Sequence, residues 1–314
     1  MLAHTLCTRF GTRFGTRFGT RASAHALRTR ASLATNANYA NPNVDEFVGE
    51  FADIRATLDY AYHVNYTPAR QLWQDRAIKS VVVRTAPQID PWVVYTCGPM
   101  GAGKGYTLSW MSRHGVFPLE DIVHVDPDYF KQIMPEWNGY VKHVGDASGS
   151  KCHKESGYIQ EIAQEVAMRQ SQNVWVDGSL HNGAWFSTVF ATHRRVFPQY
   201  RLAIFVISAP ESIVRERIKK RAAETGRGIP EASIVQSLQS VATSLEMLTP
   251  LVDFVARITN VVEPELRAFE RIDTKGNWGL IESEFAKTHA APNHFPHRLA
   301  PLIVQVRPVC VPLV

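Results

Sequence analysis

The fold is decided by the stretch Gly98-Pro99-Met100-Gly101-Ala102-Gly103-Lys104, which joins an apolar segment, Trp92 to Cys97, to a predicted helix. Glycines let backbone N–H groups curl around a phosphate, and a lysine adds a positive charge for the terminal phosphates. Strand, glycine-rich loop and helix in this order predict a phosphate-binding loop (P-loop) for a nucleoside triphosphate. The predicted nucleotide site is this loop together with Gly105 and Tyr106.

One position departs from the usual pattern of such loops. A serine or threonine commonly follows the lysine and offers its hydroxyl to Mg²⁺, whereas this chain has Gly105. Thr107 lies two residues further on and is expected to point elsewhere on the helix. The run resembles that of adenylate kinases, which also have glycine here. Phosphoryl transfer therefore tolerates the change, and we expect water to replace the hydroxyl at the metal.

Strands and helices alternate beyond the loop. Strands are predicted at residues 92–97, 122–125, 173–176, 202–208 and, as the last one, 254–258. Helices are predicted at residues 104–111, 156–169, around 189–195, 210–223 and 230–248. Repeated strand–helix units predict an α/β fold of the P-loop NTPase type, with a mainly parallel sheet and helices on both faces. Apolar residues at helical spacing between 43 and 83 predict a helical N-terminal preface.

Length and composition fit one or two globular domains: the chain has 314 residues, of which 45% are hydrophobic and 20% charged. We expect a disordered Arg-rich leader (1–42), the helical preface (43–85), a P-loop domain (86–262) and a C-terminal extension (263–314). No apolar run reaches the roughly 18–20 residues of a membrane-spanning helix, so no membrane partner is expected. Four scattered cysteines indicate reduced thiols rather than a disulfide framework or a zinc site.

The basic charge is concentrated at the N-terminus. Residues 1–44 contain six arginines and no acid, which leaves 28 of the 34 basic residues against 29 acidic ones elsewhere. The nearly neutral body gives no reason to expect a long nucleic acid as partner. The leader has the composition of a mitochondrial transit peptide, but a disordered tail or a mispredicted start, with a cytoplasmic location, fits as well.

Acidic residues follow two of the predicted strands. Asp126 and Asp128 follow the second, and Asp177 and then Ser179 follow the third. The carboxyl ends of parallel strands form the ligand crevice of such folds. One aspartate could accept a proton from an attacking hydroxyl, and Asp126 and Asp177 could hold a metal through water. Alternatively, Asp126 or Asp128 caps the following helix.

A basic helix, Arg215 to Arg221, leads into a glycine- and proline-rich segment that contains Arg227. This arrangement suits a mobile lid that brings arginines onto transferring phosphates. The alternative is an ordinary charged solvent face. Glu161 lies beside an apolar helical stripe, where it could bind substrate or simply be solvated.

These motifs resemble the zeta toxin kinases, from about Val93 to Ile258. The most specific pieces are the loop, the segment VDPDYFKQIMPEW from Val125 to Trp137, and VDGS from Val176 to Ser179. Bacterial members phosphorylate the sugar of UDP-N-acetylglucosamine with ATP and Mg²⁺. The resemblance implies the following roles: Lys104 for phosphate binding, Asp128 as general base, Glu161, Asp177 and Ser179 on the substrate side, and Arg221 and Arg227 as lid arginines. His181 replaces a substrate-side arginine of the family, so the acceptor can differ.

We therefore expect an ATP-dependent kinase that phosphorylates a hydroxyl of a small molecule, such as a nucleotide sugar. A nucleoside monophosphate kinase is an alternative because of Gly105 and Asp177. A small-molecule or polynucleotide kinase of another type, and a module that binds ATP without turnover, are further alternatives. The sequence does not indicate a protein partner.

Overall fold

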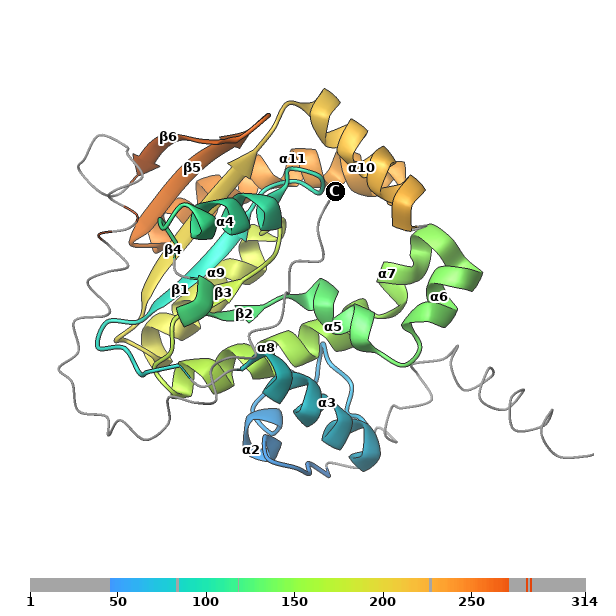
Figure 1. The fold of residues 1–314 in the computed structure, drawn as a ribbon. Coiled ribbons are helices and arrows are strands. Elements are labelled where there is room, and N and C mark those ends of the chain that lie inside the picture. The colour runs from blue at the N-terminus through green and yellow to red at the C-terminus, as the bar shows by residue number, and fades with distance from the viewer. Residues whose placement is uncertain are drawn as a thin grey trace, which may run out of the picture.

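A six-stranded sheet forms the centre of the molecule (Figure 1). The computed structural model describes residues 46–82, 85–117, 119–225 and 228–270, together with Ile281 and Ser283. The strands are β1 (Trp92–Cys97), β2 (Val123–Val125), β3 (Val174–Val176), β4 (Arg201–Ser208), β5 (Phe254–Asn260) and β6 (Pro264–Glu270), in the order β2-β3-β1-β4-β5-β6. The first five are parallel, which confirms the predicted α/β fold with a mainly parallel sheet.

Helices cover both faces of this sheet. They are α2 (Ala52–Arg55), α3 (Pro68–Val81), α4 (Lys104–Arg113), α5 (Pro127–Ile133), α6 (Trp137–Val144), α7 (Ser148–Lys151), α8 (His153–Arg169), α9 (Gly183–Val196), α10 (Glu211–Thr225) and α11 (Glu231–Leu248). Val93 and Tyr95 of β1 point into a core shared with α8, α9 and α11. Trp92 and Val94 alternate to the other face and pack in a core with α4. Burial on both faces explains why the strands read as continuous apolar runs.

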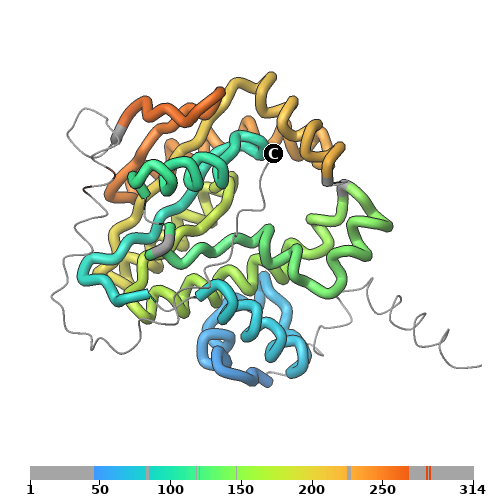
Figure 2. The backbone as a smooth tube through the Cα atoms, in the orientation of Figure 1, coloured from blue at the N-terminus to red at the C-terminus, as the bar shows by residue number. Residues whose placement is uncertain are grey.

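The N-terminal segment packs against α8, as Figure 2 shows for α3. The apolar spacing before residue 60 produces only the short α2, and α3 is the one long helix of this segment. Buried charges link it to the rest: Arg70 donates to Glu155 at 2.6 Å and to Glu136 at 3.1 Å. The segment is therefore part of the same packed body as the sheet.

Some predicted elements differ from the structure. The prediction that residues 254–258 form the last strand was wrong, because β6 pairs antiparallel with β5. The strand β6 begins with Pro264, as an edge strand can, and its residues alternate between apolar and charged as far as Ala268. The helices α6 and α7 were not predicted, and α5 was predicted only in the alternative that Asp126 or Asp128 caps the following helix. The leader 1–42, Arg227 and most of the extension after residue 270 lie outside the described residues. No helix in the described ranges is long and apolar enough to cross a membrane.

Candidate active site

The P-loop lies at the carboxyl end of β1, between β3 and β4, where the strand order reverses. Its backbone needs glycine at several positions. Gly98 has φ 147°, and a Cβ there would lie 2.1 Å from the carbonyl oxygen of Ile207. Gly103 has φ 83°, and a Cβ there would lie 2.3 Å from Nδ2 of Asn260. A side chain at Gly98 would therefore collide with the backbone of β4, and one at Gly103 would have to displace the side chain of Asn260 at the end of β5.

Residues far along the chain brace the loop. Asn260, at the end of β5, donates from Nδ2 to the carbonyl of Ala102 at 2.9 Å. Arg217 of α10 donates to the same carbonyl at 3.2 Å and to that of Asn260 at 3.1 Å. The amide of Met100 donates to Oγ of Ser237 in α11 at 3.1 Å. These braces were missed in the sequence, since no local pattern links them to the loop.

Lys104 closes back over the loop that precedes it. Its Nζ donates to the carbonyls of Gly98 at 3.1 Å and Pro99 at 3.2 Å. Burial lowers the pKa of the Lys104 ammonium, while the negative charges of Asp177 and Asp128 act in the opposite direction. Both carboxylates therefore lie close enough to Lys104 to share one electrostatic environment with it.

The hydroxyl that usually follows the lysine is missing in the structure as well. Gly105 stands in the first turn of α4. Thr107 is buried, and its Oγ1 donates to the carbonyl of Gly103 at 3.0 Å, within the same helix. Thr107 thus points away from the phosphate side, as its position in the sequence predicts.

Asp126 caps α5 and also belongs to an acidic cluster with Asp128 and Asp177. Its side chain accepts from the backbone amide of Asp128 at 2.8 Å, and Pro127 begins the helix. Burial, with the negative charges of Asp177 and Asp128, raises the pKa of the Asp126 carboxyl to about 7. Nearby carboxylates held this way favour a cation among them.

Asp128 lies in the first turn of α5 beside basic side chains. Lys131 donates from Nζ to Oδ1 of Asp128 at 2.9 Å. Burial lowers the pKa of His153, and the positive charges of Lys131 and His181 lower it further, while Asp128 opposes the shift. Asp128 is therefore paired with Lys131 and shares an electrostatic environment with His153, and these two partners had been given no role from the sequence.

Asp177 and Ser179 follow β3. Thr96 of β1 donates from Oγ1 to Oδ1 of Asp177 at 2.7 Å and accepts from the amide of Gly178 at 3.0 Å. This pair of bonds holds the turn after β3 against the strand that carries the P-loop. Ser179 Oγ and His181 Nδ1 are 2.9 Å apart. The structure thus brings together Lys104, Asp126, Asp128 and Asp177 at one edge of the sheet, with Ser179 and His181 following Asp177.

Glu161 lies in α8 and contacts the N-terminal segment. Its Oε1 is 3.0 Å from Nε2 of His63, a buried residue of the N-terminal segment. Its negative charge also contributes to raising the pKa of Tyr95 on β1, after burial as the main cause. The contact of Glu161 with His63 ties it to the N-terminal segment. Its role on the substrate side remains a prediction.

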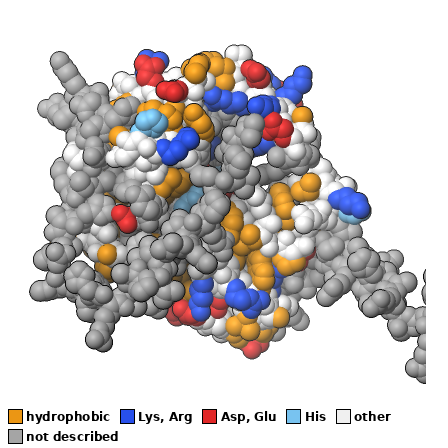
Figure 3. Space-filling view, in the orientation of Figure 1, with side chains coloured by type: hydrophobic (Ala, Val, Ile, Leu, Met, Phe, Trp, Pro, Cys, Tyr) orange, Lys and Arg blue, Asp and Glu red, His pale blue; other side chains and the backbone are white. Residues whose placement is uncertain are grey.

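The predicted lid begins in α10, which lies with α5 to α7 beyond the carboxyl ends of the strands (Figure 1). Arg221 acts on Lys104, because its positive charge contributes to lowering the pKa of that ammonium. Figure 3 shows Lys and Arg side chains over this region, mixed with acidic ones. Arg215 of the same helix forms salt bridges with Glu211 and Glu231. The helix therefore has a solvated, paired side as well as an arginine near the loop.

A histidine also joins the acidic cluster. A ring nitrogen of His124 and carboxylate oxygens of Asp126 and Asp177 all lie within 4.8 Å of one another. Burial lowers the pKa of His124, and a neutral imidazole is the form that binds a metal. The position of His124 two residues before Asp126 could have indicated this, since alternate residues of an extended segment share a face.

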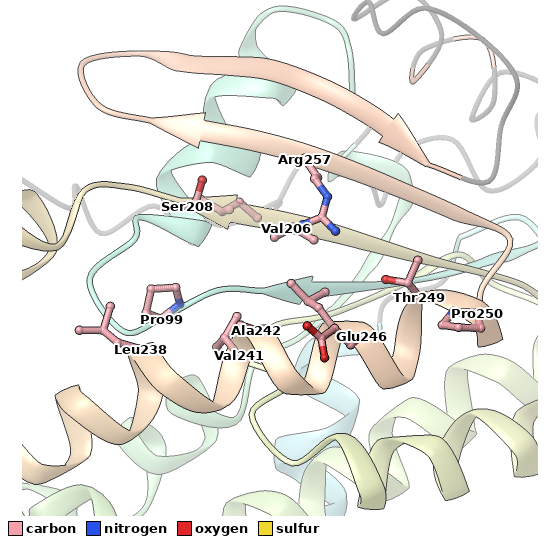
Figure 4. A pocket seen from close by; sticks show the side chains of 12 residues that line it. Pro99, Val206, Ser208, Leu238, Val241, Ala242, Glu246, Thr249, Pro250 and Arg257 are labelled. Carbon is pink, nitrogen blue, oxygen red and sulfur yellow. The ribbon is translucent and has the colours of Figure 1, made fainter.

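A cavity of about 660 Å³ lies between the sheet and α11 (Figure 4). Its walls are β4, Arg257 of β5, and the side of α11 that carries Val241 and Glu246. Pro99 is its only lining residue from the predicted site. The cavity therefore lies behind the P-loop and is separate from the cluster around Lys104.

The comparisons with known proteins agree with this geometry. A family model described as zeta toxin matches residues 75–271, more than half of the 314 residues. The chain belongs to the zeta toxin family. The match begins inside α3 and ends just after β6, so it includes the P-loop, the acidic cluster and α10. Zeta toxin membership identifies a P-loop phosphotransferase of the ATP-dependent kinase type.

Solved structures share the fold. One, from work on the PezAT chromosomal toxin–antitoxin system of Streptococcus pneumoniae, has a TM-score of 0.54 and 14% identity, over 70% of this chain and 88% of that one. Another, AvrRxo1-ORF1:-ORF2 with ATP, has a TM-score of 0.51 and 12% identity, over 84% of both chains. At such identities the likeness shows the fold alone. No curated protein matches the chain.

Proposed function

We propose that this zeta toxin family member transfers the γ-phosphoryl group of ATP to a hydroxyl group of a small molecule. The observation that carries the proposal is the convergence of the P-loop lysine with carboxylates from two strand ends. The negative charges of Asp177 and Asp128 stabilise the Lys104 ammonium and oppose the lowering of its pKa by burial. A phosphate donor at the loop would thus lie beside groups that can accept a proton.

Each group has a distinct role in this proposal. Residues 98–106 bind the nucleotide. Asp128 accepts the proton of the attacking hydroxyl, while Lys104, Arg221 and Arg227 stabilise the charge on the transferring group. A divalent cation, which the sequence predicts to be Mg²⁺ held through water by Asp126 and Asp177, would neutralise charge on the phosphates. Most of the rate enhancement would come from positioning and electrostatics.

The acceptor side contains Glu161, Asp177, Ser179 and His181. Lys131 donates to the base at 2.9 Å and places a positive charge beside it. This favours an acceptor that carries a phosphate or another anionic group, such as a nucleotide sugar. The replacement of a family arginine by His181 leaves the identity of the sugar nucleotide to experiment.

The test is transfer of label from γ-labelled ATP into a panel of small molecules, with products separated by chromatography. We expect Lys104→Ala and Asp128→Asn each to lower transfer by about 10²-fold or more. Two exposed residues give matched controls, Lys79→Ala on α3 and Asp121→Asn at the opposite end of β2. Both controls should keep the parent rate.

The other outcomes are equally distinct. Exchange of phosphate with AMP, CMP or UMP alone would identify a nucleoside monophosphate kinase, in line with Gly105. Tight ATP binding without a product for any acceptor would identify a binding module. Unchanged transfer in both the Lys104 and Asp128 variants would refute the assigned roles.

A further inference from the structure

The P-loop of this chain cannot supply the hydroxyl that commonly binds the nucleotide's metal. Gly105 has no side chain, and Thr107 is buried with its Oγ1 hydrogen-bonded to Gly103. A metal at this edge of the sheet needs another protein ligand, or it is held by water and carboxylates alone.

The paired strands β2 and β3 present such a ligand. His124 lies in β2, and Asp126 follows the strand in an extended conformation as the N-cap of α5, so the two side chains point to the same face. Asp177 follows β3, and its amide donates to the carbonyl of Val125 at 3.0 Å. The register of the two strands thus places one imidazole and two carboxylates together, with ligand atoms no more than 4.8 Å apart. Ligand atoms about 2.1 Å from a tetrahedral ion lie about 3.4 Å from one another, so the three groups must approach by up to about 1.4 Å to hold one ion.

The imidazole is held in place but incompletely bonded. The ring of His124 stacks on Trp175 with centroids 3.8 Å apart and planes 10° from parallel. Its Nε2 is buried and has no hydrogen-bond partner within the described structure. A buried polar atom of this kind is costly, and native structures rarely leave one without a ligand, water or ion. A rigid imidazole beside two carboxylates is a typical ligand set for a divalent metal.

We propose that His124, Asp126 and Asp177 form a binding site for a divalent transition metal, such as Mn²⁺, Co²⁺ or Zn²⁺, in preference to Mg²⁺. Imidazole nitrogen suits these ions, whereas Mg²⁺ prefers oxygen ligands throughout. The ion would serve the nucleotide of the proposed function, and only in this respect does the inference rest on that function. His124 would compensate for the missing hydroxyl at Gly105.

The experiment measures metal binding to tag-free protein without nucleotide. Isothermal titration gives the affinities for Mn²⁺ and Mg²⁺, and the visible spectrum of the Co²⁺ complex reports nitrogen ligation. We expect Mn²⁺ to bind at least about tenfold more tightly than Mg²⁺. His124→Phe keeps an aromatic ring against Trp175 and should weaken Mn²⁺ binding by about tenfold or more and change the Co²⁺ spectrum.

A second histidine provides the matched control. His114 also stacks on a tryptophan, Trp110 with centroids 4.0 Å apart, but it is exposed at the end of α4. His114→Phe should bind Mn²⁺ like the parent. Asp126→Asn keeps a residue that can cap α5, removes one charge and should also weaken Mn²⁺ binding. Circular dichroism and thermal unfolding identify variants that fail to fold.

Two results would overturn the inference: no Mn²⁺ binding by the folded parent protein, or equal Mn²⁺ affinity in the parent and His124→Phe. The proposed function is judged separately by phosphoryl transfer in Mg²⁺ and in Mn²⁺. Metal binding without transfer to any acceptor would keep the site and refute the kinase. Phosphoryl transfer by a protein whose Mn²⁺ affinity does not depend on His124 would support the kinase and refute the metal site.

Discussion

Replacing Gly103 by alanine tests how the P-loop is held against β5. The residue has φ 83° and ψ 38°, a region that costs an alanine about 1–2 kcal/mol. The new Cβ would lie 2.3 Å from Nδ2 of Asn260, which donates to Ala102 at 2.9 Å. Displacing that amide loses a hydrogen bond worth about 1 kcal/mol. The sum is about 2–3 kcal/mol, or roughly a 30- to 150-fold loss in ATP affinity if it falls on the loop.

Three further proteins make this prediction decisive. Gly157→Ala is the matched control, because a Cβ on this glycine of α8 meets nothing within 4 Å. It should be neutral or stabilise by up to about 1 kcal/mol. Asn260→Ala removes the clashing amide, so the added cost of Gly103→Ala in that background should fall to the backbone part, about 1–2 kcal/mol. ATP titration and urea unfolding give the values. The reasoning fails if Gly103→Ala behaves like Gly157→Ala, or if its cost is the same in the Asn260→Ala background.

Three other predictions concern stability. Arg70→Met should lower the free energy of unfolding by about 3–5 kcal/mol in urea, because it leaves two buried carboxylates without their cation; a loss under 1 kcal/mol would contradict this. Burial lowers the pKa of His193 to about 4, below the unfolded value of 6.5, so the parent protein should lose up to about 3 kcal/mol as pH falls from 6.5 to 4. His193→Gln should remove that part of the pH dependence, and an unchanged profile would exclude the assignment. Asn182 caps α9 by accepting from the amide of Trp185, so Asn182→Ala should cost about 1 kcal/mol in thermal unfolding while Asn182→Ser costs little; equal losses would show that the cap is not the cause.

The elements around the P-loop were predictable because their signals are local. An apolar strand, the glycine pattern and the helix after Lys104 are contiguous in the chain. Asp126 as a cap was one of two readings of the same motif, and the structure shows the cap together with the acidic cluster. Local patterns of this kind can be read from the sequence because their turn conformations and capping hydrogen bonds involve residues that are close together in the chain.

What was missed depends on contacts between distant segments. Asn260 and Arg217 brace the loop across more than 100 residues of sequence, and nothing around either residue indicates it. His124 joins Asp177 only through the register of β2 and β3. β6 was overlooked because an edge strand needs only one apolar face. The lid role of Arg227 and the substrate role of Glu161 remain predictions.

The buried charges between α3 and α8 bear on where this family's catalytic unit can be cut. The family match starts at residue 75, after Arg70, although Arg70 neutralises Glu136 and Glu155 inside the matched region. His63, also before the match, contacts Glu161. A gene fusion or truncation that begins at the family boundary would therefore inherit two acids without their counter-ion. In this chain the matched family region, 75–271, is shorter at its N-terminus than the packed body, because the packed body includes Arg70 and His63.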